Sequence, residues 1–410
     1  MARARSGAPR RRVRAGRSSR RHSLGGVLEC LHLDGPTSRT QLTELTGLTR
    51  STIAELVQEL GQLGFVEERA APLVTGPGRP SPVVHPRPQA AVVLAVELAV
   101  ASVSLATVGL GGRVLARSRL ARPEDDPAAL VAEIAAAAAP LLAALPDRAR
   151  VVGTGVAVVG VARSQDGVVE LAPNLGWRGV PLGAMLDAAL GLPGWLLVGN
   201  DADLGALAEQ RRGVGRGVEH LLYVSGEVGL GCGVISSGIP LRGTHGFAGE
   251  AGHMLVNPDG RPCRCGATGC WETEAGSARL LARAGLATGS AGIDELEVRA
   301  AAGEAAACAA LCEVGRWLGI GIGDLVNLFD PQLVVLGSVY GRLFGWLEPS
   351  LRDGVGLRSM TAMGGAVEVV RSGLVGEAAL LGAAELVFDR LLADPAGAVR
   401  RRSEPRVAGG

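Results

Sequence analysis

Three cysteines and one histidine lie within a short segment of the chain. His253 is followed by Cys263, Cys265 and Cys270, and glycines near the cysteines would let the backbone fold tightly around an ion. One imidazole and three thiolates make a complete tetrahedral set for Zn²⁺, and a closed set of four protein ligands is typical of a structural site. The alternative is three reduced core cysteines, but core cysteines favour apolar runs and this segment is rich in Gly, Pro and Arg. The sequence therefore predicts a structural zinc site.

Polar residues suited to binding hydroxyl groups flank this cluster or follow an apolar run. They are Asn200, Asp201, Glu250 and Glu272. Carboxylates and an amide that converge on one cleft can hydrogen-bond several hydroxyls at once, as sugar recognition requires. Each residue alone has a simpler explanation as a helix cap or a surface acid, so only the joint pattern indicates a sugar site.

The segment 24–63 has the pattern of a helix-turn-helix. Apolar residues recur at helical spacing in three runs, which are separated by Asp34-Gly35-Pro36 and by Gly47. Ser38 and Thr49 are candidate N-caps of the second and third helices. Two helices, a tight turn and a third helix form the motif whose last helix enters the major groove of DNA.

The residues that would contact DNA lie at the start of the third helix and in a following turn. Arg50, Ser51 and Thr52 could reach base edges and phosphates. After a strand-like stretch at 65–69, the turn at 75–80 could form a wing that offers Arg79 to a minor groove or a phosphate. The alternative is a generic three-helix scaffold.

Charge is distributed unevenly along the chain. The whole sequence has a net charge of +1, yet the first 22 residues carry nine arginines and no acid. A basic arm on a near-neutral body indicates a polyanionic partner at one end only. Aromatic residues make up only 3% of the chain, which disfavours stacking on single-stranded nucleic acid. Double-stranded DNA is therefore the expected partner.

We expect a cytoplasmic protein with reduced cysteines. The most apolar helix candidate, 130–145, is short for a membrane span and contains Glu133 and Pro140, and no export signal is evident. Reduced cysteines favour metal binding over disulfides where they cluster. The other cysteines, Cys30, Cys308 and Cys312, are expected to be small core residues, whereas the role of Cys232 is left open.

Residues 89–395 are predicted to form two related α/β lobes that face a cleft. Glycine-rich strand–turn–strand hairpins are expected at 92–115 and 221–237, and Ala-rich helices at 128–145 and 303–318. Ligands in such folds usually bind between lobes.

The motif Gly-Glu-Ala-Gly-His at 249–253, followed by Cys-Arg-Cys-Gly-Ala-Thr-Gly-Cys-Trp-Glu at 263–272, resembles the signature of the ROK family of sugar-responsive repressors and sugar kinases. The resemblance extends over most of 90–395, and the preceding winged helix is similar to that of the xylose and N-acetylglucosamine repressor branch. It implies a two-lobed actin-like ATPase (ribonuclease H-like) fold and a homodimer or homotetramer.

The resemblance also implies roles for individual residues. Sugar contacts would come from Asn200, Asp201, Glu250, His253 and Glu272. His253 would bind zinc through one ring nitrogen and face the sugar with the other. In the family's kinases, the residue at the position of Asp201 is the general base.

Two departures from the kinase pattern favour a sensor over a catalyst. Kinases read approximately Asp-x-Gly-Gly-Thr in the first hairpin, where this chain has Glu-Leu-Ala-Val-Ala at 97–101. In the second hairpin, Gly-Thr-Gly becomes Glu-Val-Gly at 227–229. Side chains replace glycines where the backbone would approach phosphate, and a new carboxylate would repel it. We therefore expect no enzyme activity and regard Asp201 as a vestigial base.

The sequence thus predicts four segments: a basic disordered arm (1–22), a winged helix-turn-helix (23–88), a ROK sugar-sensing body (89–395) and a disordered tail (396–410). The predicted protein is a repressor of carbohydrate genes that a sugar or sugar phosphate releases from its operator. One alternative is a sugar kinase with a DNA-binding domain. Another is a DNA-binding protein whose body serves only for oligomerisation.

Overall fold

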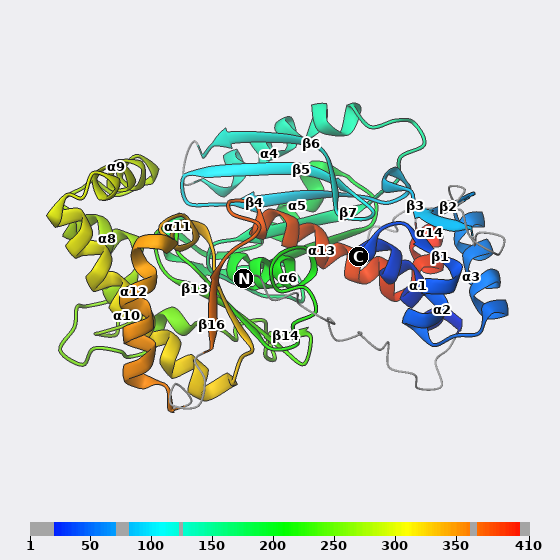
Figure 1. Cartoon of the computed structure of the whole chain (residues 1–410). Coiled ribbons are helices and arrows are strands. Elements are labelled where there is room, and N and C mark those ends of the chain that lie inside the picture. The colour runs from blue at the N-terminus through cyan, green and yellow to red at the C-terminus, as the bar shows by residue number, and fades with distance from the viewer. Residues whose placement is uncertain (1–19, 71–81, 123–125, 361–366, 402–410) are drawn as a thin grey trace.

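The computed structural model describes residues 20–70, 82–122, 126–360 and 367–401. A small N-terminal unit of helices and short strands lies at one end of a larger body, in which two β-sheets alternate with layers of helices (Figure 1).

The N-terminal unit is a helix-turn-helix with a three-stranded sheet of order β1-β3-β2. Its elements are α1 (Arg20–Asp34), β1 (Thr37–Ser38), α2 (Arg39–Thr46), α3 (Arg50–Gln62), β2 (Val66–Arg69) and β3 (Val83–Pro86). Ser38 and Gln41 form a reciprocal capping box at the start of α2, and the Thr49 hydroxyl accepts the Thr52 backbone N–H at the start of α3. Gly47, at φ +71°, ends α2 in the left-handed conformation of a tight turn. Both predicted caps and the predicted turn are confirmed.

The first lobe of the body is built on a mixed sheet of order β11-β7-β4-β5-β6. After the 3-10 helix η1 (Pro88–Ala90), its antiparallel strands are β4 (Val92–Leu98), β5 (Ser102–Gly109) and β6 (Arg113–Ala121). Its parallel strands are β7 (Val151–Val158) and β11 (Trp195–Asn200). The helices α4 (Pro127–Ala143) and α5 (Leu182–Leu190) pack against it. A small sheet contains β8 (Val161–Ala162), β9 (Val169–Ala172) and β10 (Trp177–Val180), with η2 (Pro173–Leu175) before β10.

The second lobe repeats this topology, with its sheet in the order β14-β13-β12-β15-β16. The antiparallel strands are β12 (Leu221–Ser225), β13 (Gly231–Ser236) and β14 (Ile239–Pro240), and the parallel ones are β15 (Leu333–Leu336) and β16 (Glu368–Arg371). Its helices are η3 (Ala251–His253), α7 (Trp271–Ala275), α8 (Ser277–Arg283), α9 (Ser290–Ala301), α10 (Ala305–Phe329), α11 (Ser338–Arg342) and α12 (Phe344–Arg358). In both sheets a three-stranded antiparallel meander is extended by two parallel strands, as expected of related lobes.

Two helices lie between the sheets and connect all parts of the molecule. They are α6 (Asp201–Arg212) and α13 (Ala378–Ala393). α6 packs on β12 and β13, α13 packs on β4 and β7, and the two helices pack against each other (Figure 1). The apolar core around them continues into the N-terminal unit, where it includes Leu28 and Leu31 of α1. The N-terminal unit is therefore docked on the body rather than tethered by a linker alone.

Both predicted terminal boundaries require correction. The predicted arm ends before residue 20, because α1 begins at Arg20, which pairs with Glu59 at 3.0 Å, while Arg21 pairs with Asp394 at 3.2 Å. The predicted tail begins later, because 395–401 form α14 (Pro395–Arg401), which packs against α1 (Figure 1). Residues 1–19 and 402–410 lie outside the described residues.

The long helix α10 also differs from expectation. Its Cys308 and Cys312 are exposed rather than buried, because they lie four residues apart on the face that points away from the core. α10 is the one helix among the described residues that is long and apolar enough to cross a membrane. Half of its apolar window is buried in the protein, however, and it packs along α12, as a core helix does.

Candidate ligand cleft, metal cluster and DNA-binding helix

Asn200 fixes the start of α6 at the edge of the first sheet. Its Oδ1 accepts the backbone N–H groups of Ala202 (2.8 Å) and Asp203 (3.1 Å), and its Nδ2 donates to the Gly160 carbonyl at 3.0 Å. The residue is thus an N-cap. This places Asp201 at the first position of α6.

The two hairpins bring further carboxylates to Asp201. Burial, followed by repulsion from Glu227, raises the pKa of Asp201 to about 7. Burial and repulsion from Glu227 and Asp201 raise the pKa of Glu97 to about 8. The Glu227 carboxylate accepts the backbone N–H of Val100, in the turn of the first hairpin. The turns of both lobes therefore meet at the N-terminus of α6 and place acids there.

Glu250, His253 and Glu272 gather beside the same helix end. Burial raises the pKa of Glu250, with His253 opposing and Glu272 adding to the shift, and the Glu250 charge in turn raises the pKa of Asp201. The Glu272 carboxylate reaches the second hairpin, since a Cβ on Gly229 would lie 2.6 Å from its Oε2. Four of the predicted sugar contacts, Asp201, Glu250, His253 and Glu272, therefore lie close enough to influence one another's charge. The fifth, Asn200, caps the helix that carries Asp201.

Two charged residues near this cleft were not predicted. Asp203 and Arg242 line a small pocket of about 110 Å³ together with Asn200 and Arg390. Burial raises the pKa of Asp203 to about 8, although Arg242 opposes the shift. The only sequence signal for Asp203 was its place in the capped first turn of α6, and Arg242 had none.

The four predicted metal ligands converge. One ligand atom from each of His253, Cys263, Cys265 and Cys270 lies within 4.8 Å of the others. Sulfur atoms on a tetrahedral zinc ion with bonds of about 2.3 Å would be roughly 3.8 Å apart. The Sγ atoms of Cys265 and Cys270 are 3.7 Å apart, and the same distance separates Cys263 Sγ from His253 Nδ1. The donor set and its spacing fit Zn²⁺.

The loop around this cluster links it to the cleft. Gly269, at φ +74°, packs so closely that a Cβ would lie 1.7 Å from the Asn257 carbonyl oxygen, which explains why a glycine is needed there. Glu272 Oε1 lies 3.0 Å from Cys263 Sγ and 3.7 Å from His253 Nδ1. His253 thus turns Nδ1 toward the cysteines, which leaves Nε2 on the opposite edge of the ring.

The predicted DNA-contacting residues begin α3. Arg50 and Ser51 are exposed and Thr52 is half-buried. The Thr49 hydroxyl bonds the hydroxyls of Ser51 and Thr52, each at 2.9 Å, so the cap also orders the side chains of the first turn. Arg79 lies outside the described residues.

The far end of α6 contacts the N-terminal unit. Arg212 donates from Nη1 to the carbonyl oxygens of His32 (2.8 Å) and Gly111 (3.1 Å), and from Nε to Glu385 at 2.8 Å. Arg211 donates to Glu385 at 3.1 Å. Although burial opposes it, the neighbouring His32 and arginines hold the pKa of Glu385 well below its usual range.

His32 joins α1 to this ionic cluster. Its Nδ1 accepts the Gly111 backbone N–H at 3.0 Å, and its Nε2 faces both a Glu385 oxygen, at 3.1 Å, and Arg212 Nη2. Burial lowers the pKa of His32, although Glu385 opposes the shift. The ring also packs on Phe388, with centroids 4.6 Å apart.

Comparison with known proteins identifies both parts of the chain. Residues 93–390 match the model of the ROK family, and residues 25–70 match the IclR helix-turn-helix domain. A putative xylose repressor from Caldicellulosiruptor sp. (strain Rt8B.4) is 32% identical over 382 residues, covering 87% of this chain and 93% of its own length.

Solved structures of two kinds resemble the fold. A ROK family transcriptional regulator, a homologue of the E. coli MLC protein, has a TM-score of 0.76 and 27% identity, and covers 93% of this chain and 99% of its own. A ROK family glucokinase from Streptomyces griseus, in complex with glucose and AMPPNP, has a TM-score of 0.65 and 29% identity, and covers 73% and 99%. The match of the family model over most of the body establishes that this chain belongs to the ROK family.

Proposed function

We propose that the protein is a repressor that binds operator DNA through its N-terminal unit and releases the DNA when a sugar or sugar phosphate binds the carboxylate cleft. The observation that carries the proposal is the course of α6. This single helix begins at the cleft with Asp201 and ends with Arg212 on the N-terminal unit, about 17 Å away at 1.5 Å per residue. The named xylose repressor relative spans both parts of the chain and supports the same function.

The sugar would lie against Asp201, Glu250, His253 and Glu272. Their oxygens accept hydrogen bonds from sugar hydroxyls, and His253 can add Nε2 as a further partner. Asn200 acts mainly by positioning Asp201, because its side chain is already bonded to backbone groups. Asp203 and Arg242 extend the polar surface on the neighbouring side of α6.

A structural Zn²⁺ ion held by His253, Cys263, Cys265 and Cys270 would stiffen the loop that carries the cleft residues. The bound ion supplies no chemistry of its own here beyond fixing the fold of 253–270. Since Nδ1 of His253 would be taken by the metal, the ring would be held with Nε2 directed away from the cluster.

Phosphoryl transfer is not expected. Catalysis of that reaction depends on positive groups and backbone donors around the transferring phosphate. Here Glu97, near the end of β4, and Glu227, in the turn between β12 and β13, face Asp201 instead. The likeness to a glucokinase keeps sugar kinase activity as the alternative, since a carboxylate with a pKa of about 7 would suit a general base.

DNA binding would use a homodimer or a homotetramer in the cytoplasm. Two copies of α3 must match two half-sites about one helical turn apart, so a small movement of either N-terminal unit would lose several contacts together. A movement of α6 would be transmitted to the N-terminal unit through the ionic cluster around His32 and Glu385.

The proposal is tested by selecting bound duplexes from a random DNA library and measuring their affinity with D-xylose, D-glucose and the corresponding phosphates. We expect one of these sugars to weaken binding. A coupled assay of ATP consumption with the same sugars addresses the kinase alternative and should show none. Sugar-dependent ATP consumption without any effect on DNA binding would favour the kinase.

A further inference from the structure

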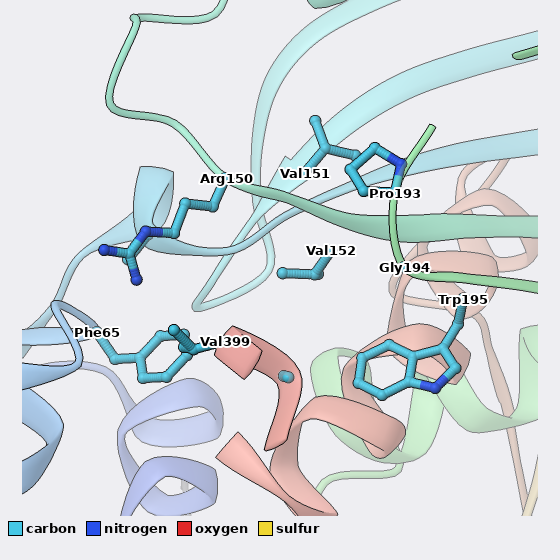
Figure 2. A pocket seen from close by; sticks show the side chains of 10 residues that line it. Phe65, Arg150, Val151, Val152, Pro193, Gly194, Trp195 and Val399 are labelled. Carbon is cyan, nitrogen blue, oxygen red and sulfur yellow. The ribbon is translucent and has the colours of Figure 1, made fainter. Parts of the chain in front are cut away.

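A second pocket, of about 330 Å³, opens where the N-terminal unit, the first lobe and α14 meet. Figure 2 shows Phe65 from the N-terminal unit, Val152 from β7, Trp195 from β11 and Val399 from α14 around it. It shares no lining residue with the polar pocket beside Asn200, so it is a separate site.

The walls of this pocket are apolar except at one end. Arg150 is the one charged residue in its lining. Its Nη1 donates to the Leu63 carbonyl at 2.7 Å, and among the described residues it has no carboxylate partner. A guanidinium carries five N–H donors, so most of its hydrogen-bonding capacity remains for a ligand.

This combination defines the chemistry of a ligand. Trp195 is half-buried and offers an aromatic surface that favours a planar apolar group, and a carboxylate matches the fork of the Arg150 guanidinium. The volume is at the lower end of the range of about 300–1,000 Å³ in which proteins enclose small ligands. We infer that this junction pocket binds a compact aromatic carboxylate, with its acid group on Arg150 and its ring against Trp195.

Such a ligand would act on the N-terminal unit independently of the sugar. Its contacts come from three parts of the chain, so it binds only while they are docked together and stabilises that arrangement. Hydrogen exchange should then slow at residues 63–66 and in α14. The inference goes beyond the proposed function, because nothing in it depends on the carboxylate cleft.

The test is calorimetric titration of the full-length protein, without sugar, using 1-naphthoate and its neutral amide, 1-naphthamide. We expect naphthoate to bind about tenfold more tightly or better, which corresponds to about 1.4 kcal/mol. Arg150→Met should remove this preference. Arg148→Met, at an exposed position two residues earlier, is the matched control and should keep it.

Arg150→Met also removes the hydrogen bond to the Leu63 carbonyl and could for that reason disturb the fold. A second variant therefore tests the pocket without changing Arg150. Val152→Phe should fill the pocket and abolish binding of both probes. Equal affinity for acid and amide, no binding of either, or naphthoate binding that survives Val152→Phe would overturn the inference. So would a marked gain in affinity when the chain is ended at residue 401, because residues 402–410 would then be the natural occupant.

Discussion

Arg212 Nη1 donates a hydrogen bond to the backbone carbonyl of His32 at 2.8 Å and so joins the last residue of α6 to the last turn of α1. The contact is part-buried, and it lies beside the pair formed by Arg212 and Glu385. Because the other end of α6 carries Asp201, a shift of this helix would be felt at both the cleft and the N-terminal unit.

Arg212→Met should uncouple sugar binding from DNA release. The sugar should still bind, but its effect on operator affinity should fall to less than about twofold, from a coupling that is typically about 5–150-fold in allosteric proteins. The measurement is operator affinity with and without sugar, beside a direct sugar titration.

Arg216→Met provides the matched control. Arg216 also pairs with α1, through Asp34 at 2.8 Å, but on the exposed surface beyond the end of α6. It should keep full coupling. Glu385→Gln serves as a second disruption if Arg212→Met does not fold, and intact coupling in both would rule out transmission through this cluster.

Glu97→Gln should stabilise the protein in mild alkali. The folded-state pKa of Glu97 is about 8, raised above its unfolded value, so the favourable contribution of its protonated form is lost as pH rises through 8. A glutamine cannot ionise and avoids that loss, by a few kcal/mol at most, since one pKa unit corresponds to about 1.36 kcal/mol.

The pH profile of thermal unfolding checks this prediction. The variant and the wild type should unfold alike at pH 4, diverge progressively as the pH rises from there toward 8, and stay apart by a constant amount above it, whereas the exposed Glu133→Gln should follow the wild type throughout. If Glu97→Gln were less stable than the wild type at pH 9, the carboxylates of Glu97, Asp201 and Glu227 would not be in mutual repulsion, and the prediction would be wrong.

Cys265→Ser should lower both zinc content and stability. It removes one of four ligands while leaving a side chain of similar size, and structural metal binding is coupled to folding. Elemental analysis should find about one zinc per wild-type chain and clearly less in the variant. Cys308→Ser, at an exposed cysteine outside the cluster, should change neither quantity. Wild-type protein prepared without chelator and free of zinc would refute the assignment.

Deleting residues 1–19 should weaken binding to all duplexes by similar factors. The segment contains seven arginines and no acid, and each lost phosphate contact lowers the slope of log affinity against log salt by about 0.9. The deletion stops before Arg20, whose pairing with Glu59 belongs to the folded unit. An unchanged slope would mean that the arm does not touch DNA.

Local signals explain what the sequence could predict. The caps Ser38 and Thr49 act on residues close to them in the chain, so their types and spacing are sufficient. The carboxylates of the two hairpins were identified because each turn departs from a known family motif.

The remaining features depend on tertiary packing. His32, Arg212 and Glu385 come from three distant helices, and nothing near any one of them in the chain indicates the other two. The same holds for Arg242 beside Asp203, and for α14, whose position depends on its packing against α1.

The central claim is that a sugar in the carboxylate cleft controls DNA binding. Its most direct test is operator affinity with and without the identified sugar, for wild type and Glu250→Ala, with the exposed Glu219→Ala as control. The account predicts that Glu250→Ala abolishes the sugar response while binding to DNA without sugar stays within about twofold of wild type, because Glu250 lies at the cleft end of α6, away from α3. A Glu250→Ala protein that still responds fully to the sugar would place the effector site elsewhere and contradict the account.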